Sequence, residues 1–312
     1  MSDHIPMRVA VVGATGFQGG ATARLLAERG HPVHTLSRRP AADRPELPGI
    51  SFRSGDLGRC DDVRRLFEGA THAAVALPLV YQAEKVMRYA QHLAKAAGEA
   101  GLRRLVYNAG TRVPDRTTDV VGFETRRLAE TVFREGLAHS GVELVVLRPP
   151  VYLDNLFGPW TGPALVNEGV LAHPLPAERP VAWISHRDLA EAVHAALTVD
   201  GVAGRTFDIG GARTLTGPRL ARAFARGLGR SVRYEPLDPA EFERRLARIA
   251  GAEAAAGVAG IYRHLATGRE PELLAGDDGS SAALLSLKPA SVEEWVTRRP
   301  WQLWSGGREG RR

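Results

Sequence analysis

A short apolar segment that runs into a glycine-rich turn constrains this fold most. Residues 8–12 have the composition of a buried strand, and Gly13, Gly16 and Gly19 follow before a helical pattern. The first glycine permits a tight turn, the second lets the backbone approach a pyrophosphate, and the third allows close helix–strand packing. The helix start also offers N–H groups and a positive dipole end to phosphates. The pattern predicts a phosphate-binding loop formed by Gly13, Thr15, Gly16, Phe17, Gln18 and Gly19, with an ordinary strand-to-helix turn as the alternative.

The rest of the first half alternates apolar runs with helical patterns. We expect strands at 31–37, 73–77, 105–107 and 144–147, and helices at 16–29 and 81–100. Strands that are apolar throughout and separated by helices indicate a parallel sheet covered on both faces. The predicted fold class is therefore α/β, a doubly wound parallel (Rossmann) sheet spanning residues 1–150.

The character of the chain changes after residue 150, where prolines break it into loops and short pieces. We expect residues 151–304 to form a smaller, mixed and mostly helical substrate lobe. It interleaves with the sheet, because residues 181–211 include a further strand at 206–209. Residues 215–228 and 244–265 have helical patterns, and 305–312 are expected to be a flexible tail.

The end of the second strand decides which nucleotide the loop would hold. An acid there would bind the ribose 2′-hydroxyl, but this chain has Ser37, Arg38 and Arg39 instead. Forked guanidinium donors suit a phosphate dianion, so we predict NADP(H). A solvated arginine pair in a surface loop is the alternative. Asp56 and Leu57 follow the third strand and are assigned to the adenine side, with a helix-capping role for Asp56 as the other interpretation.

Composition excludes several classes of protein. The net charge is +6, but only three residues are lysine, and the arginines are scattered without interleaved aromatics, which argues against a nucleic-acid partner. A single cysteine, Cys60, cannot form an internal disulfide or a thiolate metal cage. No apolar run approaches the ~20 residues of a membrane helix. We therefore expect a soluble cytoplasmic protein with no membrane partner and no metal.

Taken together, these residues resemble the NmrA-like branch of the atypical short-chain dehydrogenase/reductases over nearly the whole chain. The matching segments are 13–19, 37–40, 56–57, 77–79, 147–149 with Asn155, 184–190 and 291–295. The resemblance implies that Leu77, Pro78, Asn108 and Ala109 also bind the cofactor. It also implies a homodimer as one option for the assembly.

The chain departs from this superfamily where the chemistry is expected. Ala109 occupies the position of the catalytic serine, with Thr111 as a substitute, and residues 112–144 contain no tyrosine or lysine. Glu130 or a neighbour stands where the branch has a lysine. The Tyr81–Lys85 pair has the spacing of two residues on one helical face and is our candidate catalytic pair. A packing and surface role is the alternative.

Candidate substrate contacts cluster beyond the strand ends, where open α/β sheets bind ligands. They are Tyr81, Thr111, Tyr152, Asn155 and Trp160. Asp188 is interpreted as the cap of a helix over 189–197, with His186 as a second pocket residue in the alternative.

The function predicted from the sequence is an NADPH-dependent reductase of a small, largely apolar carbonyl, enone or quinone-like substrate. Two alternatives stay open. One is a non-catalytic NADP(H)-sensing regulatory protein that acts through a protein partner, which the missing tyrosine and lysine permit. The other is a non-redox isomerase or cyclase on the same scaffold.

Overall fold

A parallel sheet of seven strands organises the structure. The computed structural model describes residues 7–39, 47–277 and 279–305. The strand order is β3-β2-β1-β4-β5-β6-β10, and every neighbouring pair is parallel. The strands are β1 (Val9–Val12), β2 (Val33–Ser37), β3 (Ile50–Ser54), β4 (His72–Ala76), β5 (Arg104–Asn108), β6 (Glu143–Arg148) and β10 (Thr206–Asp208). This order reverses between β1 and β4, so a crevice opens there at the carboxyl ends of the strands.

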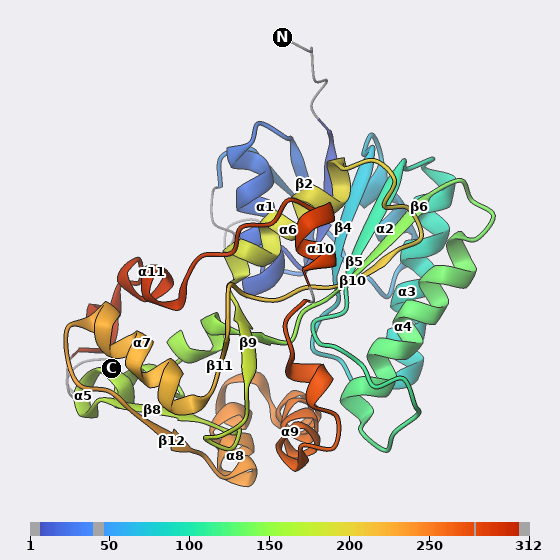
Figure 1. Cartoon of the computed structure of the whole chain (residues 1–312). Helices are drawn as coiled ribbons and strands as arrows, with labels where there is room; N and C mark the ends of the chain where they lie inside the picture. Colours follow the sequence, from blue (N-terminus) through green and yellow to red (C-terminus); the bar gives the residue numbers. More distant parts are fainter. Residues whose placement is uncertain (1–6, 40–46, 278, 306–312) are drawn as a thin grey trace.

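Helices cover both faces of the sheet, which confirms the predicted doubly wound fold (Figure 1). On one face lie α1 (Phe17–Glu28) and α6 (His186–Thr198). On the other lie α2 (Cys60–Phe67), α3 (Ala83–Glu99) and α4 (Val121–Leu137). Apolar side chains of β1, β4, β5 and β6 are buried between these layers. These four strands carry their histidine, charged and amide residues at their ends, at His72, Arg104, Asn108, Glu143 and Arg148.

The start of α3 differs from the expectation. The helix begins at Ala83 with Gln82 as its N-cap, so Tyr81 lies in the preceding loop and not on the helix. The ring of Tyr81 packs against Gly257, where any added Cβ would collide with it. This long-range contact holds Tyr81 outside the helix, and Tyr81 and Lys85 therefore do not share a helical face.

Most of the second half outside α6 and β10 forms a lobe below the sheet in Figure 1, while α10 (Ser280–Leu284) lies higher, beside α6. The lobe contains a small sheet of β7 (Val151–Tyr152), β9 (Val181–Ile184) and β11 (Thr214–Leu215), and a pair of strands, β8 (Val170–His173) and β12 (Arg233–Pro236). Its remaining elements are η2 (Leu153–Phe157), α5 (Gly162–Glu168), α7 (Gly217–Leu228), α8 (Pro239–Ala250), α9 (Ala252–Thr267), η3 (Pro271–Leu274), α11 (Val292–Thr297) and η4 (Trp301–Trp304).

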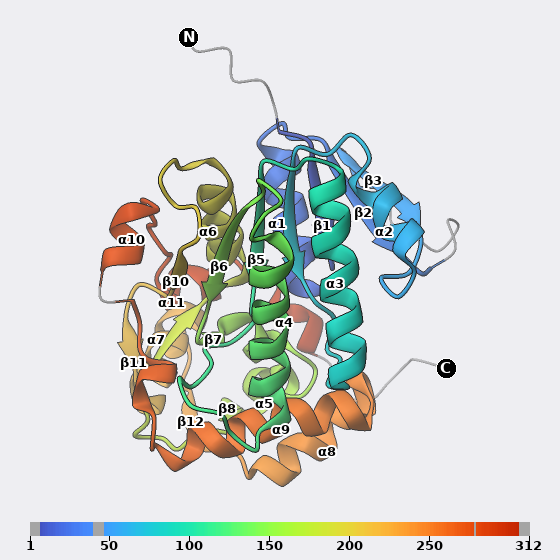
Figure 2. The same ribbon diagram turned by 90° about the vertical axis from the view of Figure 1, so that its right-hand side faces the viewer.

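Helices α8 and α9 form a hairpin that lies across the lower end of the molecule (Figure 2). The helical stretch expected over 244–265 is divided at Gly251, whose φ of +84° lies in the left-handed region. Glycine adopts this conformation without the steric penalty of a Cβ, so the chain can turn sharply there. The hairpin brings Leu246 of α8 and Leu265 of α9 to the cavity described below.

Two sequence predictions about the chain ends have different outcomes. The closing helix expected at 291–295 is α11, which Ser291 starts with a reciprocal capping box to Glu294. The predicted tail falls almost wholly outside the described residues, as does Pro40 of the arginine turn. Among the residues that the structure describes, no helix is both long and apolar enough to cross a membrane.

Candidate functional site

One large cavity occupies the crevice between the sheet and the α8–α9 hairpin. Its volume is about 600 Å³, and its walls come from the loops after β1 to β5 and from α8 and α9. It therefore joins the glycine turn at one end to an apolar compartment at the other. Except for Arg39, it is lined by every residue that the sequence assigned to a cofactor, substrate or catalytic role.

The glycine turn has the close packing that the sequence predicted. Gly13 has a φ of +86°, and a Cβ there would lie 2.6 Å from the carbonyl oxygen of Ala76 on β4. A Cβ on Gly19 would lie 2.9 Å from the Ala14 amide nitrogen and closer still to the Gly13 carbonyl. The neighbouring backbone atoms leave no room for a Cβ at either position, so both residues must be glycine.

Gly16 differs from its two neighbours in the turn. Its φ of −97° is ordinary, and a Cβ would meet only the Gly13 carbonyl oxygen, at 3.3 Å. It is the N-cap of α1, and no side chain caps this helix start or places an acid in its first turn. The helix start therefore presents N–H groups and positive potential to the cavity, which fits a diphosphate.

The arginine turn lies at the edge of the same crevice. Arg38 lines the large cavity, whereas Arg39 lines an adjoining pocket of about 380 Å³ together with Ser37 and Thr15. The Ser37 hydroxyl accepts a hydrogen bond of 3.1 Å from the Arg39 amide, which fixes the turn. Arg24 of α1 also lines this pocket. Arg24 was not predicted, because in the sequence it looks like any exposed residue of an amphipathic helix.

Asp56 lies in the cavity wall and orders its own loop. Its carboxylate accepts a hydrogen bond of 2.7 Å from the Gly58 amide, and its amide donates one of 2.8 Å to Asp62. That backbone hydrogen bond, partly opposed by desolvation, lowers the pKa of Asp62. The N-cap of α2 is Arg59, so Asp56 does not cap this helix. Leu57 lines the cavity beside Asp56.

Asn108 connects three segments around the centre of the cavity. Its amide nitrogen donates to the Gln18 oxygen at 2.8 Å and to the Tyr152 hydroxyl at 3.3 Å, and its oxygen accepts from the Gly110 amide at 3.0 Å. Burial raises the pKa of Tyr152 far above its ordinary value. Asn108 therefore ties the loop after β5 to the glycine turn and to β7.

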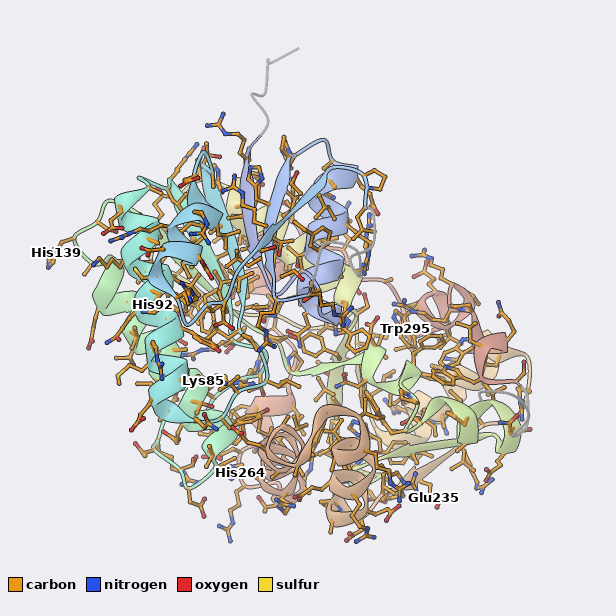
Figure 3. The ribbon with its side chains drawn as sticks, turned by 180° about the vertical axis from the view of Figure 1, so that it is seen from behind. Lys85, His92, His139, Glu235, His264 and Trp295 are labelled. Atoms are coloured by element: carbon orange, nitrogen blue, oxygen red, sulfur yellow. The ribbon has the colours of Figure 1, made fainter. Side chains whose placement is uncertain are left out.

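Tyr81 meets an arginine on the far wall. The Arg126 guanidinium lies 4.7 Å from the centre of the Tyr81 ring and donates a hydrogen bond of 3.5 Å to its oxygen. Burial raises the pKa of Tyr81, and Arg126 acts in the opposite direction. Lys85 is half-buried in the first turn of α3, where Figure 3 labels it, and it also lines the cavity.

Glu130 does not line the cavity, and its carboxylate is paired with two arginines. Its buried carboxylate accepts from Arg134 at 2.8 Å and from Arg148 at 2.9 Å. The cation that lines this wall is instead Arg126, one turn earlier on α4. Thr111, the proposed substitute for a serine, is buried and donates to the Arg112 carbonyl oxygen at 3.1 Å.

His186 begins helix α6 and lines the cavity near Tyr152. Its amide donates to Asp154 at 2.7 Å, and its ring centre lies 4.8 Å from that of Tyr152. The expectation that Asp188 caps this helix is wrong, because the N-cap is Ser185, whose hydroxyl accepts from the Asp188 amide. The pocket interpretation of His186 agrees with its position.

The apolar compartment holds a second set of polar groups. The Asn155 amide donates to the Tyr262 hydroxyl at 3.5 Å, and His173 lies beside Tyr262 with their ring centres 5.1 Å apart. Trp160 and the α8–α9 side chains Phe242, Leu246, Val258, Ile261 and Leu265 form the apolar walls. Only Asn155 and Trp160 were predicted. The other residues are distant in sequence and have ordinary helix or strand patterns.

Comparison with known proteins agrees with this geometry. The sequence matches the NmrA-like family over residues 6–296. It is 31% identical to a (4-alkanoyl-5-oxo-2,5-dihydrofuran-3-yl)methyl phosphate reductase of Streptomyces griseus subsp. griseus, covering 73% of this chain and 77% of that protein. It is 30% identical to an NAD(P)H azoreductase of Xenophilus azovorans, covering 72% of this chain and 76% of that protein. The structure resembles the NADP(H) complex of Citrobacter sp. triphenylmethane reductase, with a TM-score of 0.72 and 19% identity over 93% of this chain and 99% of that one.

Proposed function

The chain belongs to the NmrA-like family, and from that premise we propose that it is an NADPH-dependent reductase of a small, largely apolar carbonyl, enone or quinone-like substrate. The observation that carries the proposal is the continuity of one cavity from the glycine turn to the α8–α9 compartment. A nucleotide bound at the turn would reach the compartment without leaving the cavity. The two relatives that match this chain at 31% and 30% identity over 73% and 72% of its length are both reductases.

The residues around the crevice fit NADP(H). The backbone of the glycine turn would hold the pyrophosphate, and Arg24, Arg38 and Arg39 with Ser37 would hold the 2′-phosphate. Asp56 and Leu57 would contact the adenine side, and Leu77, Pro78, Asn108 and Ala109 the nicotinamide half. When bound, NADPH supplies a hydride to the substrate.

Tyr81 is the group that this chain offers as a proton donor. Because Arg126 donates to the tyrosine oxygen, the hydroxyl proton remains available to a substrate oxygen in the cavity. The fixed positive charge of Arg126 would stabilise negative charge that develops on Tyr81 or on the substrate. Lys85 would add a second positive charge at the same wall. Orientation of the substrate in the cavity would supply the rest of the acceleration.

Steady-state oxidation of NADPH tests the proposal, with menadione, cyclohexenone and benzaldehyde as representative substrates. Wild type is expected to oxidise NADPH with at least one of them. Tyr81→Phe is expected to lower kcat by about 10²-fold or more while NADPH binding is retained. Tyr234→Phe is the matched control, because its hydroxyl donates to the Leu175 carbonyl oxygen and the residue does not line the cavity.

Two results would contradict the proposal in different ways. Tight NADPH binding without turnover of any substrate would favour the NADP(H)-sensing alternative. Turnover that is unchanged in Tyr81→Phe would remove Tyr81 from the mechanism and leave the proton to water or to the substrate.

A further inference from the structure

His173 at the end of β8 is a buried polar residue with no visible partner. Its side chain is only 3% exposed, and among the described residues neither ring nitrogen has a hydrogen-bond partner. Its carbonyl oxygen accepts from the Leu175 amide at 2.9 Å and from the Leu237 amide at 3.0 Å, so the backbone oxygen is satisfied. A buried ring nitrogen without a partner costs free energy, and such groups are rare in folded proteins.

His173 lines the cavity at the end formed by the second half of the chain. Its edge contacts are aromatic, with ring centres 4.9 Å from Trp183 and 5.1 Å from Tyr262. The Tyr262 hydroxyl and the Asn155 amide, 3.5 Å apart, line the same cavity. Polar groups from β8, α9 and η2 therefore meet in a compartment whose other walls are apolar.

The imidazole is uncharged in this environment. Burial lowers the pKa of His173 to about 3, so at neutral pH one ring nitrogen carries a proton and the other is an acceptor. Burial alone lowers this pKa, without a contribution from any acidic or basic side chain among the described residues. A carboxylate or an ammonium group would lose its hydration there without compensation. An uncharged hydroxyl or carbonyl can instead pair with one of the ring nitrogens.

We propose that His173, supported by Tyr262 and Asn155, is a specificity-determining residue that binds an uncharged oxygen of an aromatic substrate, remote from the carbon that is reduced. This inference deepens the proposed function and rests on it, because the bound molecule is a substrate only if the protein is a reductase. Binding at His173 does not itself require turnover. It defines the preferred ligands as apolar rings that carry a phenol or a second carbonyl. The apolar walls pack against the ring of the ligand, and the imidazole of His173 forms a hydrogen bond with its oxygen.

A purely structural role for His173 is the competing explanation, in which the ring only fills space between Trp183 and Tyr262. His173→Phe separates the two roles, because phenylalanine keeps an aromatic ring at this position and removes both nitrogens. His173→Gln makes the opposite change, since it keeps a donor and an acceptor and removes the ring. His139→Phe is the matched control, because His139 is exposed at the edge of the molecule (Figure 3).

The test measures binding of naphthol and of naphthalene to the NADPH-loaded protein by isothermal titration calorimetry. Wild type and His139→Phe are expected to bind naphthol about tenfold more tightly than naphthalene. His173→Phe is expected to lose this preference while its affinity for naphthalene stays unchanged, and His173→Gln to retain most of it. The proposal is overturned if wild type shows no preference, or if His173→Phe keeps it.

A second measurement uses the wild-type protein, so that the proposal can still be tested if a variant does not fold. In wild type labelled with ¹⁵N-histidine, naphthol is expected to shift the ring-nitrogen resonances of His173, and naphthalene to leave the hydrogen-bonding pattern unchanged. His173→Gln assigns these resonances. Absence of any naphthol-specific shift would also overturn the proposal. If the naphthol preference depends on His173 but NADPH is never oxidised, the binding site stands and only the reductase function fails.

Discussion

Gly16→Ala and Gly19→Ala are expected to impair different properties: the first NADPH binding, and the second the stability of the fold. At Gly16 an added methyl group meets only one carbonyl oxygen, at 3.3 Å, and the backbone angles suit any residue. The apo protein should therefore fold. Because Gly16 lines the cavity, the methyl group would hold a pyrophosphate away from the helix N–H groups. Losing one charge-assisted hydrogen bond costs about 2 kcal/mol, or about thirtyfold in Kd.

Gly19→Ala acts on the fold instead. The added Cβ would lie 2.9 Å from the Ala14 nitrogen and still closer to the Gly13 carbonyl, and backbone atoms cannot rotate away as side chains can. Overpacking of this kind costs about 1–3 kcal/mol. In a chain of this size each 1 kcal/mol lowers Tm by about 1.5 °C. The melting temperature of the apo protein should fall accordingly.

Thermal melting of the apo proteins and titration of NADPH fluorescence check both expectations. Gly260→Ala is the matched control. A Cβ there would have only an ordinary 3.7 Å contact with Val120, so alanine should leave NADPH binding unchanged and slightly stabilise α9. The reasoning is refuted if Gly16→Ala binds NADPH like wild type, or if Gly19→Ala melts like wild type.

Three further outcomes follow from the same geometry. Arg39→Ala should weaken NADPH binding by about tenfold or more and leave NADH binding unchanged, as competition titrations with both nucleotides would show; equal losses for both would refute 2′-phosphate recognition. Glu130→Gln should lower the free energy of unfolding by about 1–3 kcal/mol in urea titrations, because Arg148 loses its buried carboxylate; an unchanged midpoint would mean that the pair is neutral. Burial lowers the pKa of His72 to about 4 and that of His173 to about 3. Because the unfolded imidazoles bind protons below pH ~6.5, stability should be complete above that value and fall from about pH 6.5 toward pH 4 in urea titrations; a flat profile would contradict the buried neutral state.

The parts of this protein that could be predicted from sequence are those in which local pattern decides structure. The strand β1, the glycine turn and α1 follow one another within 20 residues of chain, and Gly13 and Gly19 each have their own steric reason. The capping box of α11 is likewise local, because Ser291 and Glu294 lie three residues apart. Such features need no knowledge of the rest of the chain.

The parts that could not be predicted depend on contacts between distant segments. Tyr81 looked helical, but its ring is held in the loop by Gly257 of α9. Arg24 became a pocket residue only once the loop after β2 was placed beside α1. His173 carried the one signal that sequence reasoning could have used, since it is a polar residue in an otherwise apolar strand of four residues.

The charges around the cavity differ in kind from a catalytic lysine, because Glu130 is paired with arginines and the neighbouring cation is a guanidinium. A lysine can lower the pKa of a neighbouring tyrosine and can itself lose a proton, whereas Glu130 is held by Arg134 and Arg148. The cation beside Tyr81 is Arg126, whose guanidinium stays protonated at any physiological pH. Burial raises the pKa of Tyr81 more than Arg126 lowers it, so the tyrosine stays a neutral hydroxyl through the neutral range. A site of this kind is suited to donating a proton to an oxygen that becomes negative during reduction, and poorly suited to removing a proton from an alcohol. With Tyr81 in the proposed role of proton donor, this charge arrangement favours reduction over the reverse oxidation at neutral pH.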